Sequence, residues 1–430
     1  MAAAIRERAP TSKRWRERRS ASADHREPGA MSSARAFLLA GCLLPAATAA
    51  AGAECAGGLG TRVVPLPVYA TLPNEGDTLG FMPVFLRVCD ANARTESIIA
   101  PSITWNDVIH WTGTFRWFHY PADDQTLTLI ASASTRINSG VLLQWRDLPR
   151  RAGEFTTEIE LRWQRSAFYR FFGLGPDTTE AAETSYTRVR GLGEARRGFN
   201  LGGNWNAGIG VLLHTDAVQD LGVPGLPLSR RVSPQRLAPG MDGSTIAGQT
   251  IDIRFDSRPN GENSERGLFA NAAAGVVEGL SGAPAYLRGS IRVRALYPEL
   301  GFVGGAARFD WTGVSTSRAP FYDQSTLGGA FLLRGFTEDR FIDQNAWTLE
   351  AEQRIRLLQT HIYGVTADWR IDPFIAVGQV YRAIDQAFSR PRVTGGVGFR
   401  AWVRPNVVGR IDVATGGEGW KVYVEIGYPY

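Results

Sequence analysis

The chain has 430 residues, of which 44% are hydrophobic and 21% are charged, and its mean hydropathy is −0.15. This balance excludes a bundle of membrane helices, because each helix would need about 20 consecutive apolar residues. The 21 Phe, 12 Tyr and 12 Trp residues exclude a disordered chain, since so much aromatic surface is not left in water. The net charge of +5 would indicate a nucleic-acid partner only if it belonged to the folded part of the chain.

The basic residues are concentrated at the start of the chain. Residues 1–35 carry the whole net charge, so residues 36–430 are formally neutral and we expect no nucleic-acid partner. An apolar run over residues 36–44 and small residues ending at Ala53 follow, in the order typical of a secretory signal peptide. We therefore predict a leader over residues 1–53 and a short periplasmic N-terminus over residues 54–61. Met31 offers an alternative start, which would place residues 1–30 outside the natural protein.

The cysteines depend on how this leader is processed. Leu39-Ala-Gly-Cys42 fits the pattern before a lipid-modified cysteine, which is the alternative to cleavage near Ala53. Cleavage there leaves Cys55 and Cys89 in an oxidising compartment, where two thiols can pair. Because their separation in space cannot be read from the sequence, a Cys55–Cys89 disulfide and two free thiols both stay open.

Apolar and polar residues alternate with a period of two along several segments, as expected for β-strands. These segments cover residues 63–70, 155–164, 251–258, 287–295, 347–357 and 420–430. Charged residues of both signs fill the polar face, and aromatic residues such as Trp347, Trp369 and Trp420 stand near strand ends on the apolar face. A lipid-facing apolar surface, a polar lumen and aromatic residues at the membrane interfaces define a transmembrane barrel. We therefore predict an all-β, antiparallel barrel over residues 62–430, located in the bacterial outer membrane, rather than a periplasmic sandwich.

The length sets the number of strands only loosely. Sixteen strands would leave about 24 residues for each strand with its connection, against about 10 residues for the membrane-spanning part. We predict 16 strands and long loops over residues 176–184, 218–248 and 318–342.

Three motifs occur in order along this predicted barrel. The first is Leu333-Arg334-Gly335-Phe336, and the second is Asp256-Ser-Arg258 followed by Gly267. The third is a terminal strand that ends in aromatic residues, with the positions Trp420, Val424, Ile426, Gly427, Tyr428 and Tyr430. Together they resemble the (V/L)RGF loop, the D-x-R strand end and the terminal strand of the BamA/TamA-type bacterial surface antigen superfamily of outer-membrane assembly barrels.

The resemblance implies a role for each loop residue. The loop would fold into the barrel, where Arg334 would meet acidic residues of the wall, Gly335 would allow a close approach and Phe336 would pack beneath the loop. By strand parity the wall partners are Glu350, Glu352, Asp368 and Asp372, and Glu352 is the first choice. The family's F-x-D-x-G motif aligns with residues 374–378, where Ala376 replaces the acid, so Asp372 is expected to substitute for it.

The resemblance also implies insertion or translocation of proteins or lipids at the outer membrane. Family members of this kind carry periplasmic POTRA modules, and no such module fits between Ala53 and Val63. The expected partners are therefore outer-membrane lipid, the barrel assembly machinery for the chain's own insertion, and an unknown periplasmic protein in place of the POTRA modules. The alternative is a structural barrel or passive pore that favours anions through lumen arginines, namely Arg288, Arg292, Arg294, Arg400, Arg404 and Arg410.

Catalysis is not expected from this sequence. The histidines beyond the leader, His110, His119, His214 and His361, are too scattered for a metal site, and Ser281 lacks a G-x-S-x-G elbow. We predict no catalytic residue, no metal and no cofactor, with a lipid-acting outer-membrane enzyme as the remote alternative.

Overall fold

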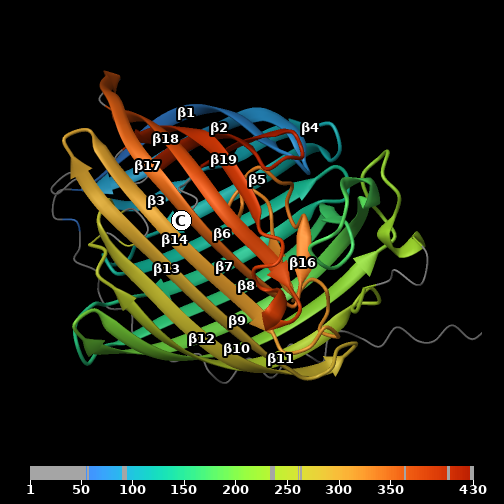
Figure 1. The fold of residues 1–430 in the computed structure, drawn as a ribbon. Coiled ribbons are helices and arrows are strands. Elements are labelled where there is room, and N and C mark those ends of the chain that lie inside the picture. Colours follow the sequence, from blue (N-terminus) through green and yellow to red (C-terminus); the bar gives the residue numbers. More distant parts are fainter. Residues whose placement is uncertain are drawn as a thin grey trace, which may run out of the picture. The chain divides into compact units, whose positions relative to one another are not determined.

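Long antiparallel strands account for most of the chain in the computed structural model (Figure 1). The structure describes residues 55, 58–89, 94–232, 238–259, 261, 264–362, 365–403 and 407–426. The predicted leader, Arg404 and the terminal positions Gly427, Tyr428 and Tyr430 lie outside the described residues.

The elements follow one another in this order. The strands are β1 (Leu59–Leu72), β2 (Gly76–Cys89), β3 (Thr95–Ile99), β4 (Ser102–Asn106), β5 (His110–His119), β6 (Gln125–Ser134), β7 (Ser139–Asp147), β8 (Phe155–Phe171), β9 (Thr184–Gly202), β10 (Trp205–Gln219), β11 (Ser244–Asp256), β12 (Gly267–Ser281), β13 (Tyr286–Leu300), β14 (Val303–Val314), β15 (Ser325–Leu327), β16 (Phe341–Asp343), β17 (Asn345–Ile362), β18 (Val365–Tyr381), β19 (Arg392–Val403), β20 (Val407–Thr415) and β21 (Trp420–Ile426). Three short 3-10 helices cover Glu180–Ala182, Ser229–Arg231 and Ile384–Gln386.

Each strand of the main sheet pairs with its neighbours in the chain, and β1 pairs with β21 to close the ring. β3 and β4 both lie between β2 and β5 and act as one interrupted strand, so the ring has 18 strands. The interruption falls at Pro101, opposite Pro83 of β2, where neither residue has an N–H to donate. The prediction of 16 strands is wrong, because tight turns such as Gly203-Asn204 between β9 and β10 use fewer residues than the average we assumed.

The alternation in the sequence becomes the two faces of the barrel wall. Leu349 and Ile375 are exposed on the outer face, whereas Glu350 and Glu352 are buried on the inner face. The segments predicted from period two coincide with β1, β8, β11, β13, β17 and, as far as Ile426, β21. No helix in the described ranges is long and apolar enough to cross a membrane.

Three long connections gather at the end of the barrel where β8, β10 and β14 end. They span residues 172–183, 220–243 and 315–344 and agree with the predicted loops. The last of them contains the small hairpin β15–β16, which lies against β17 and β18. The loops share an apolar core with the adjoining strand ends, made of Phe171, Tyr186, Val218, Ala238, Met241, Phe321, Tyr322 and Ile342. Gly240 permits this packing, because a Cβ there would lie 2.8 Å from the ring of Pro320.

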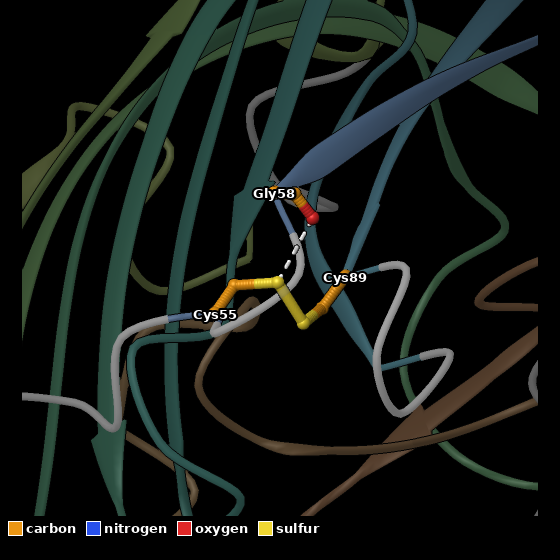
Figure 2. Close-up of a disulfide and its surroundings, with 3 residues drawn as sticks. All are labelled: Cys55, Gly58 and Cys89. Atoms are coloured by element: carbon orange, nitrogen blue, oxygen red, sulfur yellow. Dashed lines mark hydrogen bonds between the residues drawn. A yellow bond between two sulfur atoms is a disulfide. The ribbon is translucent and has the colours of Figure 1, made fainter.

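The two cysteines are joined in a disulfide at the start of the barrel (Figure 2). Their Cα atoms are 5.7 Å apart, and the carbonyl oxygen of Gly58 lies 2.9 Å from Sγ of Cys55. Because Cys55 precedes β1 and Cys89 is the last residue of β2, the disulfide links the segment before β1 to the end of β2, the strand that pairs with β1. Of the two possibilities that the sequence left open, the structure has the paired form.

Candidate functional site

Arg334 is the centre of a buried ionic cluster. Its guanidinium donates to Glu350 Oε1 at 2.7 Å, to Glu352 Oε2 at 3.1 Å and to Asp412 Oδ1 at 3.0 Å. The side chains of all four residues are fully buried. The guanidinium carbon also lies 3.5 Å from the ring centre of Phe374, which adds a cation–π contact. The structure thus brings Arg334 together with both glutamates that the sequence analysis selected.

Three further arginines extend this cluster along the inner wall. Arg400 bonds to Asp412 at 2.8 Å, to Asp372 at 3.2 Å and to Glu352 at 3.5 Å. Arg354 bonds to Glu352 at 3.3 Å. Arg410 bonds to Asp412 at 3.2 Å and to Glu425. We call this set, with Arg334 and Glu350, the ionic cluster. It places four arginines against five carboxylates, which limits the free energy lost when charges leave water.

The other predicted wall partners lie beside this cluster rather than on Arg334. Asp372 is bonded to Arg400 and so joins the cluster indirectly, and Asp368 accepts a hydrogen bond from Gln359 at 2.8 Å. Asp412 is the partner that the sequence analysis missed. It lies on β20, three strands away from Glu350 on β17, so only the curvature of the closed ring brings the two together.

Apolar contacts fix the loop around Arg334. Leu333 and Phe336 are fully buried and pack with Ala376 in a core that also includes Leu327, Phe341, Ala346 and Val380. Ala376 stands where the family has an acid, so this position of β18 receives apolar loop side chains and the third carboxylate comes from β20. These contacts place Phe336 between the loop and the wall.

Gly335 meets the wall with its backbone. Its φ is +116°, and a Cβ on it would lie 2.7 Å from the carbonyl carbon of Thr415. Its N–H donates to the hydroxyl of Tyr423 at 3.0 Å, and that hydroxyl donates to the carbonyl of Phe336 at 2.6 Å. Only glycine combines this close approach with this backbone conformation, as the motif predicted.

A second arginine of the same loop was not predicted. Arg340 is buried and donates two hydrogen bonds to Glu418, at 2.7 and 2.8 Å, in the turn between β20 and β21. It also donates to the side chain and the carbonyl of Thr178, both at 2.8 Å. No pattern in the sequence distinguishes Arg340 from a solvated loop residue. It ties the 315–344 loop to the 172–183 loop and to the strand that closes the ring.

The D-x-R motif forms a compact unit at the end of β11. Arg258 donates to both carboxylate oxygens of Asp256, at 2.9 and 3.1 Å, and its guanidinium carbon lies 4.4 Å from the ring centre of Phe269. Gly267 has a φ of +114°, and a Cβ there would lie 2.9 Å from Cα of Arg258. The three predicted residues therefore meet in one place, where they fix the turn into β12.

Of the predicted positions of the terminal strand, Trp420 is exposed on the outer face and Ile426 ends β21. Tyr423, which was not among the predicted residues, is buried and bonded to the Arg334 loop. Val424 pairs with Thr71 of β1, and this is the single residue pair between the two strands in the described part of the chain.

The turn between β1 and β2 reaches the same loop. Asn74 is buried and donates to the carbonyl of Glu338 at 3.3 Å, while Arg170 donates to the carbonyl of Asn74 at 2.6 Å. Beside it, burial and then the negative charge of Glu425 raise the pKa of Glu75 to about 7, against the opposing effect of Arg170. The first hairpin and the 315–344 loop are thus connected next to the seam between β1 and β21.

The lumen arginines that suggested an anion pore differ in their surroundings. Arg400 and Arg410 belong to the ionic cluster, and Arg294 bonds to Asp310 at 2.8 Å. Arg288 and Arg292 are exposed, and neither has an ion-pair partner among the described residues. In the described ranges, no group of histidine, cysteine and acidic side chains is arranged to hold a metal ion.

A closed antiparallel ring with an apolar outer face and a charged inner face defines the chain as a β-barrel of the membrane-spanning class. Residues 125–414 match the Omp85 superfamily domain, and the chain belongs to this superfamily. This agrees with the family resemblance inferred from the motifs. Within the described part of the chain, no POTRA-like module is present.

The chain is similar to several solved structures at low sequence identity, and the first of them shows the fold. BamA from Haemophilus ducreyi lacking POTRA domains 1–3 is 13% identical, with a TM-score of 0.52, over 85% of this chain and 75% of that chain. CdiB from Acinetobacter baumannii is 10% identical, with a TM-score of 0.44, over 85% of this chain and 59% of that chain. The siderophore receptor PirA from Pseudomonas aeruginosa is 10% identical, with a TM-score of 0.33, over 85% of this chain and 66% of that chain. No curated protein sequence matches the chain.

Proposed function

We propose that this protein is an outer-membrane barrel that takes part in the insertion or translocation of proteins or lipids. The observation that carries the proposal is the seam where the first strand meets the terminal strand. Thr71 of β1 pairs with Val424 of β21, and both sides of this seam are bonded to the 315–344 loop. Tyr423 bonds to Gly335 and Phe336, and Asn74 bonds to Glu338. We infer that the barrel opens at this seam, where two edge strands meet and the loop contacts both.

We also infer that the 315–344 loop is the inward-folded loop of (V/L)RGF type. The contacts of Arg334 with Glu350 and Asp412 support this, because both acids are buried on the inner face of the wall. A loop held there fills the lumen at one end, together with the apolar core that it shares with the 172–183 and 220–243 loops. This arrangement favours work at the seam over free passage through the lumen.

The proposal implies three kinds of partner. Outer-membrane lipid would surround the apolar outer face, and the cell's barrel assembly machinery would insert the chain after export by the predicted leader. A periplasmic protein would deliver substrate in place of POTRA modules. No chemistry on a substrate is invoked, because the site consists of ion pairs and apolar packing.

Depletion of the protein, followed by an inventory of outer-membrane proteins and lipids, tests the proposed function. We expect at least one protein or lipid component to fall before growth slows, and to return when the protein is restored. An unchanged inventory of every other component would overturn the proposal.

Planar-bilayer conductance separates the proposal from the passive pore. A barrel filled by its loops should give small, irregular currents. Steady ohmic openings that favour anions would support a pore, with Arg288 and Arg292 as the solvated lumen charges, and would count against the proposal.

A further inference from the structure

The connection between β18 and β19 presents two large apolar side chains to the outside. Ile384, in the 3-10 helix Ile384–Gln386, is 81% exposed, and Phe388 is 76% exposed. Both lie in the segment of residues 382–391, which we call the β18–β19 loop. Two such side chains in a ten-residue connection form a local apolar surface that water does not favour.

Specific hydrogen bonds hold this loop in place. The indole N–H of Trp347 donates to the carbonyl of Ala387 at 2.6 Å. The side-chain amide of Gln379 donates to the carbonyl of Gln386 at 2.6 Å and accepts from the N–H of Arg390 at 3.0 Å. Because the backbone is fixed at these points and Ala387 is buried, the exposure of Ile384 and Phe388 is a defined feature of the fold.

The loop continues the apolar outer face of the barrel. The ring centre of Phe388 lies 5.3 Å from that of Trp347, which shares the outer face of β17 with exposed Leu349. Exposed Ile375 on β18 and Val393 on β19 lie on the same outer face at the two strands that the loop connects. The loop therefore joins the apolar outer face of the wall through the contact of Phe388 with Trp347.

Basic side chains flank the two apolar ones. The side chain of Arg382 is 57% exposed and lies 3.9 Å from Asp343, and that of Arg390 is 60% exposed and is paired with Asp177. Both guanidinium groups thus keep an open side toward the solvent, and Asp385 is the one acidic residue of the loop. Exposed apolar side chains with partly exposed arginines beside them suit the boundary between acyl chains and anionic headgroups.

We propose that the β18–β19 loop is a lipid-binding segment that lies in the headgroup region of one leaflet. Ile384 and Phe388 enter the upper part of the acyl chains, and Arg382 and Arg390 contact the anionic groups of the lipids. The inference rests on the proposed function only in requiring that the barrel spans a membrane. It adds a defined anchor at the connection between β18 and β19, and β20 separates β19 from β21, the strand that closes the ring.

Depth-dependent fluorescence quenching tests this inference. Single-cysteine variants Phe388→Cys, Ile375→Cys and Phe331→Cys are made in a Cys42→Ser background with the Cys55–Cys89 disulfide intact. Each is labelled with an environment-sensitive fluorophore and placed in vesicles of phosphatidylcholine and phosphatidylglycerol. Phe331 is the matched control, because it is an exposed loop aromatic whose ring lies 4.8 Å from the guanidinium carbon of Arg410 on the inner wall.

We expect position 388 to show blue-shifted emission and to be quenched most by lipids with a nitroxide near the headgroup. Position 375 should be quenched most by a nitroxide deep in the acyl chain, and position 331 by neither. Replacing both arginines (Arg382→Gln, Arg390→Gln) should weaken the quenching at position 388 in anionic vesicles.

The outcomes separate the two proposals. Quenching at position 375 without quenching at position 388 would overturn the lipid-binding loop and leave the barrel in the membrane. An unquenched label at position 388 that crosslinks to a second copy would make the loop a contact between chains and would also overturn the inference. Absence of quenching at position 375 would instead refute the membrane-spanning barrel itself.

Discussion

Arg334→Ala is the substitution that the ionic cluster makes most informative. Arg334 is the one cation bonded to Glu350 among the described residues, so its removal leaves that buried carboxylate without a partner. Glu352 and Asp412 keep other arginines, because Arg400 bonds to both of them. The substitution therefore leaves one carboxylate, that of Glu350, without an ion-pair partner, while the other carboxylates of the cluster keep theirs.

The size of the effect follows from that geometry. Breaking a buried ion pair by removal of one partner costs about 3–5 kcal/mol, most of it from the charge left behind. Glu350→Gln in the Arg334→Ala background removes that charge, so the double variant should be more stable than Arg334→Ala alone by about 1–3 kcal/mol. Arg334→Lys keeps a charge but loses the planar fork that reaches three carboxylates, and should lie between wild type and alanine.

The assay compares the temperature at which the folded, fast-migrating form is lost on gels with the rate of protease cleavage in the 315–344 loop. Arg334→Ala should lower the first and raise the second, and Glu350→Gln should partly reverse both changes. Arg318→Ala is the matched control, because Arg318 is an exposed arginine of the same loop. Wild-type heat stability and protease resistance in Arg334→Ala would refute the role assigned to the cluster.

Three other substitutions test separate parts of the structure. Gly335→Ala should destabilise the docked loop by about 1–3 kcal/mol, because the added Cβ meets the backbone of Thr415 and the residue has a φ of +116°. Gly409→Ala is the control, because the space around Gly409 is open and no destabilisation is expected. The rate of proteolysis in the 315–344 loop measures both effects. Replacing Cys55 and Cys89 by serine removes a bond across 34 residues and should cost about 3–4 kcal/mol in the unfolding of the first hairpin, and wild type should show no reactive thiol at these positions before reduction. The pKa of Glu75 is raised from 4.5 to about 7, so the protonated form favours the closed turn, and the stability of that turn is lost as the pH rises through this window. Hydrogen exchange of residues 72–76, corrected for intrinsic rates, should therefore increase by roughly 10- to 100-fold between pH 5 and pH 8 in wild type and stay constant in Glu75→Gln.

Local patterns were sufficient to predict the wall of the barrel. The alternation in residues 347–357 identifies which side chains of β17 face inward, so the sequence alone is enough to select Glu350 and Glu352 as partners of Arg334. The same alternation could not give the number of strands. That number depends on how tightly each turn is closed and on where prolines such as Pro83 and Pro101 interrupt pairing, and an average length per strand contains neither.

Contacts between distant strands could not be predicted in the same way. Asp412 lies on the polar face of β20 by its alternation with Ile411 and Val413, but its contact with Arg334 requires the ring to curve β20 toward β17. No local sequence pattern indicates the contacts of Arg340, because its partners Glu418 and Thr178 belong to two other connections of the chain. The pairing of Cys55 with Cys89 likewise follows from the register of β1 with β2, which places Leu59 opposite Cys89.

The central claim is that the barrel acts by opening between β1 and β21. Thr71→Cys with Val424→Cys places two thiols at a directly opposed pair of the seam, where a disulfide can form. The measurement is the outer-membrane inventory of cells that depend on this variant, compared with either single-cysteine variant. We expect the crosslinked seam to reproduce the losses seen on depletion and the single variants to match wild type. A crosslinked seam that leaves the inventory of wild type unchanged would contradict the account.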